Sequence, residues 1–189
     1  MDSAADLLKG TPNAEEPAEG APNMHTTERS TRMKVSYRET LTKLLEFLSK
    51  KENGVMVLST SARDVVTSRN VLVANDGLDL YFFTWARSRK CAQIQLNPRI
   101  SLCKDRVEIE GKASLLGPMF APELASALGL FKRKEPEAIA QWKCKPSMVI
   151  YHITPLFASV DGCIEDDEVL IEYIDFEKRT AYREKWADR

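Results

Sequence analysis

The sequence predicts a mainly β protein, a closed antiparallel barrel with short flanking helices, and three observations support this. Beyond residue 54 the chain breaks into many strand-length runs that are rich in β-branched and aromatic residues. Asn75-Asp76-Gly77 separates two of these runs, and such a triplet favours a hairpin because a tight turn needs residues that tolerate positive φ. The β-α-β alternation that builds a parallel sheet is missing.

The amino-terminal part of the chain predicts a tail followed by one helix. Residues 1–32 are rich in Ala, Glu, Pro, Gly, Asn and Thr, so they bury too little surface to offset their ordering entropy. We expect a flexible tail there. Ser36 and Glu39 then have capping-box spacing, and four leucines recur at helical intervals behind them. Asn53-Gly54 predicts a left-handed stop for this helix.

The rest of the chain predicts strands, two helical segments and a charged tail. One domain is expected over 33–175, followed by a tail at 176–189 that the pattern of Glu177–Arg189 predicts to be helical and exposed. The acidic run Glu165–Glu168 is interpreted as a solvated loop. The predicted helices are Ser88–Leu96 and Pro122–Trp142, the second interrupted near Pro136. The predicted strands are Val55–Thr60, Val66–Ala74, Leu78–Thr84, Ile100–Lys104, Val107–Leu116, Met148–Ile153, Phe157–Val160 and Val169–Ile174.

Composition narrows the classes of function. With 43% hydrophobic residues, 29% charged residues and a net charge of −1, the 189-residue chain has no basic excess, so nucleic acid is not an expected partner. No run approaches the roughly 20 apolar residues of a bilayer span, so no membrane partner is expected and a cytoplasmic location is favoured. The four cysteines form no C-x-x-C pair, and only two histidines could supplement them as metal ligands, so no metal site is expected.

Phosphate-loop, dinucleotide-binding, serine-hydrolase and zinc-protease motifs are all missing from the sequence. The stretch from Thr67 to Cys103 is therefore the part of the sequence most informative about function. Arg69 lies on one strand of the predicted hairpin, Thr84 ends the other, and Ser88-Arg89-Lys90 opens the next helix. Three cations, two hydroxyls and a helix amino terminus can therefore converge, which suits a dianionic phosphate. The alternative interpretation is a set of solvated surface cations.

The order of these motifs resembles a known family. R-x-V on a strand, then D-G-x-x-x-Y-F-x-T, then S-R-K and a short helix ending in N-P is similar to the pyridoxamine 5'-phosphate oxidase-like FMN-binding proteins. The similarity extends more loosely from Ser36 through Val107–Ala113 to Ile153-Thr154-Pro155. The resemblance implies a six-stranded antiparallel split β-barrel that binds FMN, and a homodimer with the cofactor at the subunit interface.

The resemblance also implies roles for particular residues. Arg69 and Lys90 would hold the FMN phosphate, helped by Arg89 and Ser88. The residues that would line the ribityl chain and the flavin ring are Asn70, Val71, Phe83 and Thr84. Trp85 or Trp142 is a further candidate for contact with the flavin, whereas His152 is expected to be a hydrogen-bonded structural residue. No catalytic side chain is implied.

Three functions remain open from the sequence. The leading hypothesis is an FMN-dependent oxidoreductase that passes electrons from a reduced nicotinamide, NAD(P)H, to a small-molecule acceptor or oxygen. The basic carboxyl-terminal motif with which true pyridoxamine phosphate oxidases bind their substrate is not found, so that particular activity is not predicted. The alternatives are a non-catalytic flavin-binding or haem-binding dimeric carrier or sensor, and an empty dimerisation domain.

Overall fold

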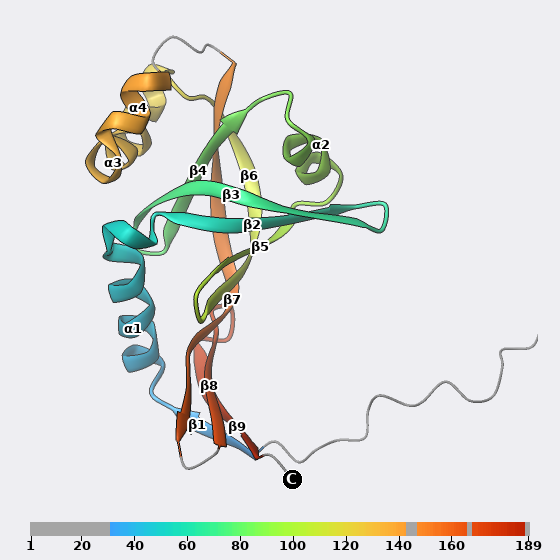
Figure 1. Cartoon of the computed structure of the whole chain (residues 1–189), viewed down its shortest axis with the longest axis vertical. Coiled ribbons are helices and arrows are strands. Elements are labelled where there is room, and N and C mark those ends of the chain that lie inside the picture. Colours follow the sequence, from blue (N-terminus) through green and yellow to red (C-terminus); the bar gives the residue numbers. More distant parts are fainter. Residues whose placement is uncertain (1–30, 143–146, 166–167, 188–189) are drawn as a thin grey trace, which may run out of the picture.

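The computed structural model describes residues 31–142, 147–165 and 168–187. These ranges contain nine strands and four α-helices, whose arrangement Figure 1 shows. Short 3-10 turns lie at Lys51–Asn53 and Pro122–Leu124. The elements are β1 (Thr31–Val35), α1 (Tyr37–Ser49), β2 (Val55–Ala62), β3 (Val65–Asp76), β4 (Asp79–Trp85), α2 (Arg89–Leu96), β5 (Arg99–Lys104), β6 (Val107–Pro118), α3 (Ala125–Lys134), α4 (Pro136–Trp142), β7 (Met148–Glu165), β8 (Glu168–Asp175) and β9 (Thr180–Ala187).

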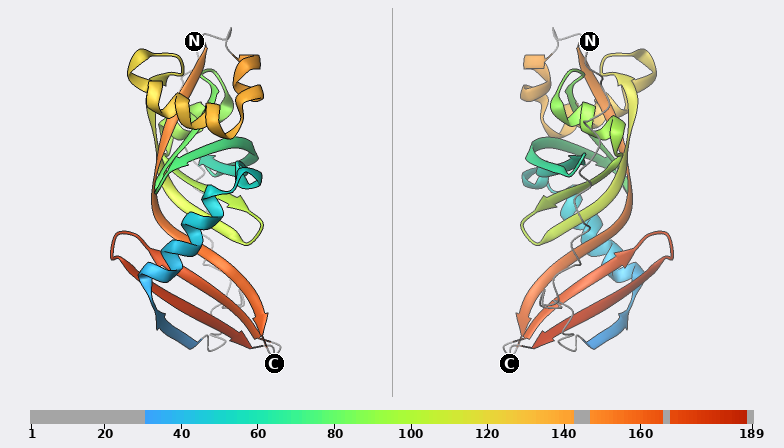
Figure 2. Two further views of the ribbon diagram at one scale, coloured as in Figure 1. Left: turned by 90° about the vertical axis from the view of Figure 1, so that its left-hand side faces the viewer. Right: turned by 90° about the vertical axis from the view of Figure 1, so that its right-hand side faces the viewer.

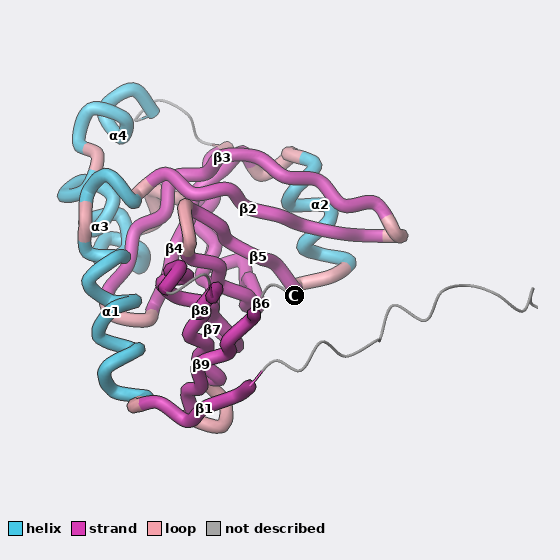
Figure 3. The backbone as a smooth tube through the Cα atoms, turned by 60° about the horizontal axis from the view of Figure 1, so that its bottom comes forward, coloured by secondary structure: helices cyan, strands magenta, loops and turns pink. Residues whose placement is uncertain are grey.

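Six strands close into an antiparallel barrel. Their order is β7-β4-β3-β2-β5-β6, and a further pairing of β6 with β7 closes the ring (Figure 3). Every neighbouring pair in the ring is antiparallel. The predicted fold class, a mainly β six-stranded antiparallel barrel with short helices, is confirmed.

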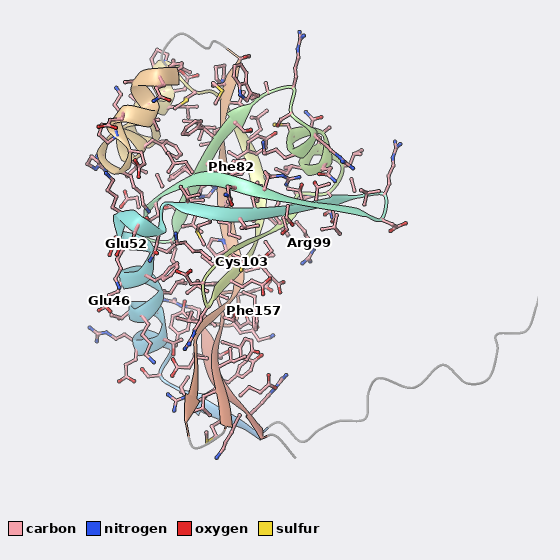
Figure 4. The ribbon with its side chains drawn as sticks, in the orientation of Figure 1. Glu46, Glu52, Phe82, Arg99, Cys103 and Phe157 are labelled. Carbon is pink, nitrogen blue, oxygen red and sulfur yellow. The ribbon has the colours of Figure 1, made fainter. Side chains whose placement is uncertain are left out.

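Two apolar cores follow from the alternation of side chains along the strands. The larger one fills the barrel and includes Leu58, Phe82 and Ile109, each 0% exposed; Figure 4 labels Phe82. The smaller one lies between the outer face of β3, β4 and β7 and the helices α3 and α4, with Phe131 at its centre. No helix among the described residues combines the length and the apolar character that a bilayer crossing requires.

Local turn chemistry sets two hairpins. Asp76 pairs with Asp79, and Gly77 in the turn between them has φ +58°, which confirms the predicted hairpin. A second hairpin joins β2 to β3 through Arg63 and Asp64, which both adopt positive φ. This hairpin projects from the barrel beside α2 (Figure 1). No glycine marks this turn in the sequence.

The predicted first helix is confirmed, but its predicted ending is wrong. The Ser36 hydroxyl accepts a hydrogen bond of 3.3 Å from the Glu39 backbone N–H, as the capping box requires. Gly54 has φ −67°, so it is not a left-handed stop. A Cβ atom at Gly54 would lie 3.1 Å from Cε of Lys134, so tertiary packing accounts for the small residue.

The two strands predicted at Met148–Ile153 and Phe157–Val160 are one strand, β7. Its register shifts where Glu110 pairs with Phe157 and Gly111 pairs with Pro155, and this bulge accommodates a proline without a backbone N–H. A Cβ atom on Gly111 would lie 2.8 Å from the Thr154 carbonyl oxygen. Glycine at 111 thus permits the close approach of β6 and β7.

The carboxyl-terminal segment corrects another prediction. Thr180–Ala187 is strand β9, not a helical tail, and it pairs with β8 and with β1 to extend the second half of β7 below the barrel (Figure 2). A boundary at 175 would cut this small sheet, and Thr31-Arg32 of the predicted tail lie in β1. The rest of that tail, 1–30, and residues 166–167 of the predicted acidic loop lie outside the described residues. Glu165 and Glu168 end β7 and begin β8.

Buried ion pairs explain why β9 is charged in sequence yet packed in the fold. Glu172 of β8 is 5% exposed and binds Arg183 of β9 at 2.6 Å and Lys43 of α1 at 3.0 Å. On the same strand as Arg183, Glu184 is also 5% exposed and binds Arg32 of β1 at 2.8 Å. Both buried carboxylates are paired with partly exposed cations, so this sheet can bury them.

Candidate functional site

Arg69 lies on the face of β3 that turns toward the barrel and α2. Its Nη1 atom donates to the Leu58 carbonyl oxygen at 3.2 Å and to the Thr60 hydroxyl at 2.7 Å. Its Nη2 atom donates to the Thr67 hydroxyl and approaches the Gln93 side-chain oxygen at 3.4 Å. Both terminal nitrogens are therefore engaged, and the guanidinium is fixed in orientation.

Lys90 comes from the first turn of α2 and meets the end of β4. Its ammonium donates to the Thr84 hydroxyl at 2.8 Å, and Thr84 is 5% exposed. Among the described residues this is the only hydrogen bond of the Lys90 side chain, so two of its three N–H donors are available to a ligand. Thr84 thus orients Lys90 without using up its charge.

The start of α2 supplies further donors. Ser88 is the N-cap residue in extended conformation, and its carbonyl oxygen accepts from the Cys91 and Ala92 backbone N–H groups. The N–H groups of Arg89 and Lys90 belong to the first turn, where a helix offers no acceptor of its own. The Arg89 side chain is exposed and forms no hydrogen bond or ion pair within the described ranges. The helix dipole favours an anion at this end.

The three cations lie close enough to influence one another. Burial lowers the pKa of Arg69, and the positive charge of Arg89 lowers it further. Burial also lowers the pKa of Lys90, the charge of Arg69 adds to this effect, and Cys91 opposes it. No carboxylate in the part of the chain that the structure describes pairs with Arg69, Arg89 or Lys90. We call these three residues the cation cluster.

Three of the predicted residues do not direct their side chains to the cation cluster. Asn70 follows Arg69 on the strand and therefore lies on the opposite face of β3, exposed. Val71 is 7% exposed and belongs to the barrel core. Phe83 packs edge-to-face on Phe131 of α3, with ring centroids 5.1 Å apart. The structure therefore brings together Arg69, Thr84, Ser88, Arg89 and Lys90, and leaves these three apart.

Gln93 is the residue that the sequence analysis missed. It is 5% exposed, and its side-chain oxygen accepts from the Thr60 hydroxyl at 2.7 Å and from the Thr67 hydroxyl at 2.6 Å. Its side-chain nitrogen donates to the Val65 carbonyl oxygen at 3.0 Å. Because residues three apart share a helix face, its spacing from Lys90 was a signal that it faces the same neighbours.

Two other candidates can be placed. Trp85 is 40% exposed at the end of β4; it follows Thr84 on the strand and pairs with Met148, so its side chain lies on the opposite face of β4 from Thr84. The Nε2 atom of His152 lies 2.8 Å from a carboxylate oxygen of Asp79, which matches the structural role expected of this histidine. The Trp142 side chain is not among those that the structure describes.

The closed ring of six strands, with β8, β9 and β1 added at one end, is the split-barrel fold. No family model matches the sequence, and no curated protein matches it either. Solved structures with the same fold do match. A proposed pyridoxamine 5'-phosphate oxidase from Listeria innocua is 22% identical, with a TM-score of 0.50, over 64% of this chain and 96% of that one.

Two further structures share the fold at lower identity. ChuZ from Campylobacter jejuni is 12% identical, with a TM-score of 0.61, and the match covers 77% of this chain and 63% of that one. The heme storage protein HutZ from Vibrio cholerae is also 12% identical, with a TM-score of 0.51, over 60% of this chain and 88% of that one. At these identities the likeness concerns the fold.

Proposed function

We propose that this protein binds FMN, with the cation cluster holding the terminal phosphate. The observation that carries the proposal is that Arg69, Arg89 and Lys90 converge at the start of α2 without a carboxylate partner among the described residues. The mutual repulsion of like charges held together in this way is unfavourable unless an anion binds between them and offsets it. A phosphate dianion neutralises them and accepts several hydrogen bonds at once.

The donor set fits a phosphate monoester. Lys90 offers two N–H donors, Arg89 offers a whole guanidinium, and the first turn of α2 adds backbone N–H groups. Arg69 contributes its positive charge rather than a terminal N–H donor, since its terminal nitrogens already donate to Leu58, Thr60, Thr67 and Gln93. Val71 is buried in the barrel core and would offer its backbone groups to the flavin ring, whereas Phe83 is only half-buried. Trp85, 40% exposed at the end of β4, is a further candidate for contact with the ring.

A second copy of the chain would complete the site. Val55, Val57 and Val66 are 47%, 38% and 67% exposed on β2 and β3, and an apolar sheet face of this kind favours burial in an interface. This apolar face supports the proposal of a homodimer.

The proposed activity is oxidoreduction. When bound, FMN supplies the redox chemistry, taking electrons from a reduced nicotinamide and giving them to a small-molecule acceptor or oxygen. The residues of this chain bind and orient: Lys90 and Arg89 hold the phosphate end, and Thr84 fixes Lys90. His152 is engaged by Asp79, so no proton transfer is assigned to it.

The visible spectrum of freshly purified protein tests the proposal, with the released chromophore identified by mass. Flavin bands, and saturable binding when the apoprotein is titrated with FMN, are the expected result. Colourless protein that takes up no FMN would contradict the proposal and favour the third interpretation, a dimerisation domain without a cofactor. Steady-state oxidation of NADH and NADPH with a panel of acceptors then tests catalysis, because a flavin that is bound but never reduced indicates a carrier or sensor.

Haem is the second candidate ligand. It is favoured by the shared fold with the heme storage protein HutZ, at a TM-score of 0.51. The same spectrum separates the two ligands, because haem gives a Soret band and flavin does not. Uptake of haem without uptake of FMN would replace the flavin proposal by a haem-binding dimeric module.

A further inference from the structure

Helix α2 is attached to the β2–β3 hairpin and β4 by a stripe of polar side chains. Lys90, Gln93 and Asn97 recur along one side of the helix, and each binds a hydroxyl group on a strand. Lys90 binds Thr84 on β4, and Asn97 binds the Ser61 hydroxyl at 3.0 Å on β2. Gln93 lies between them and is the most deeply buried polar contact of the stripe.

Gln93 and Arg69 are joined through two threonines. The Thr60 hydroxyl accepts from Arg69 and donates to Gln93, and the Thr67 hydroxyl does the same from the neighbouring strand. The Gln93 nitrogen meanwhile donates to the Val65 carbonyl oxygen, so its amide cannot flip without losing partners. This closed network determines where the guanidinium of Arg69 points.

The residue type at 93 suits this task. An apolar side chain at position 93 would leave the Thr60 and Thr67 hydroxyls without their acceptor, and Arg69 would then lose its fixed position. A carboxylate would accept from both threonines but would neutralise Arg69. A neutral amide accepts from both hydroxyls and leaves the positive charge of Arg69 uncompensated, so that it can act on the ligand.

We propose that Gln93 is a positioning residue for phosphate recognition: it holds Arg69 in place within the cation cluster, so that the cluster binds the phosphate of FMN without rearranging. The inference rests on the proposed function and deepens it. It makes Gln93 a determinant of selectivity for FMN over riboflavin, which has the same ring and ribityl chain but no phosphate. A residue that merely stabilises the fold would affect both ligands equally.

Gln93→Met tests the inference, because methionine keeps the length of the side chain and removes both polar groups. Dissociation constants for FMN and for riboflavin are measured by quenching of flavin fluorescence on the full chain. We expect FMN to bind about tenfold more weakly, as for the loss of one hydrogen bond to a charged group, and riboflavin to change less than about twofold. Thr67→Val breaks the same network from the strand side and should give the same selective loss.

Ser61→Ala is the matched control. It removes the partner of Asn97 from the same contact between α2 and the hairpin but leaves Arg69 untouched, so the ratio of FMN to riboflavin affinity should not change. Equal weakening of both ligands in Gln93→Met and Thr67→Val, with circular dichroism showing folded protein, would overturn the positioning role. An unchanged ratio in both variants would do the same. Wild-type protein that binds neither ligand would instead defeat the proposed function itself.

Discussion

Lys90 donates a hydrogen bond of 2.8 Å to the Thr84 hydroxyl, and this contact joins the first turn of α2 to the end of β4. The contact holds a cation at the point where a hairpin strand meets the start of a helix. It also leaves most of the hydrogen-bonding capacity of the ammonium unused among the described residues.

Lys90→Ala should weaken FMN binding by about 1.5–3 kcal/mol, because a charge-assisted contact to the phosphate is lost. This corresponds to roughly a tenfold to hundredfold rise in the dissociation constant. Isothermal titration calorimetry measures the change. Arg38→Ala is the control, since Arg38 is an exposed cation on α1, away from α2 in Figure 1. Equal affinities in Lys90→Ala and wild type would remove Lys90 from the phosphate site.

Val57→Lys should turn the proposed homodimer into monomers, because a charge would be buried in the apolar face of β2. Analytical ultracentrifugation should show wild-type dimers and variant monomers at the same concentration, with FMN binding weakened in parallel. Met33→Lys is the matched control: Met33 is 43% exposed, but it lies on β1 in the extension below the barrel. A wild-type chain that sediments as a monomer would contradict the shared site.

Glu172→Gln should destabilise the protein by about 3 kcal/mol at pH 7, because Arg183 and Lys43 lose a buried partner. Burial raises the pKa of Glu172, but hydrogen bonds from Arg183, Lys43 and Thr40 outweigh burial and hold the pKa below its usual 4.5. A carboxyl with a lowered folded pKa stabilises the fold above its unfolded pKa, and this contribution disappears as the pH falls through the folded value.

The difference between wild type and Glu172→Gln should therefore be largest near neutral pH and should shrink below about pH 4.5, as the carboxyl of the unfolded chain and then that of the folded chain is protonated. Urea unfolding at a series of pH values measures it. Glu46→Gln, an exposed acid on α1 labelled in Figure 4, should leave the curve of wild type unchanged. A difference that is constant with pH would mean that the charge of Glu172 contributes nothing.

Two glycine substitutions should have opposite signs. Gly111→Ala should destabilise the barrel by roughly 1–3 kcal/mol, because the new methyl group would meet the Thr154 carbonyl oxygen and the Ile153 side chain at 2.8 and 2.9 Å. Gly129→Ala should stabilise α3 by about 0.5–1 kcal/mol, since its nearest neighbour is an Arg133 nitrogen at 3.6 Å. Thermal unfolding of both variants checks the pair, and a more stable Gly111→Ala protein would contradict the close contact of β6 and β7.

Local features of the sequence were enough for several elements. The cap at Ser36, the hairpin turn at Gly77 and the helix that starts after Ser88 are all set by residues within a few positions of one another. Their chemistry does not depend on the rest of the chain, because a cap or a tight turn is satisfied by neighbouring backbone groups. The convergence of Thr84, Ser88 and Lys90 follows from the same short range.

Other features were decided only when distant strands came together. The pattern of Thr180–Ala187 predicts a charged exposed helix, yet Arg183 and Glu184 are strand residues because Glu172 and Arg32 neutralise them across the sheet. The two segments of β7 become one strand because Gly111, on a different strand, lets the chain pass through Pro155. In both cases the sequence of the segment itself does not identify the distant residues that it will pack against.

For the candidate site, the sequence by itself determined which cations and hydroxyls are present and that a hairpin brings them near a helix start. The tertiary structure decided which side chains face one another. Val71 and Phe83 turn into cores, and Gln93 reaches Thr60 and Thr67, which precede it by 33 and 26 residues. The physical reason is that a strand directs alternate side chains to opposite faces, and only the packed neighbours determine which face binds a ligand.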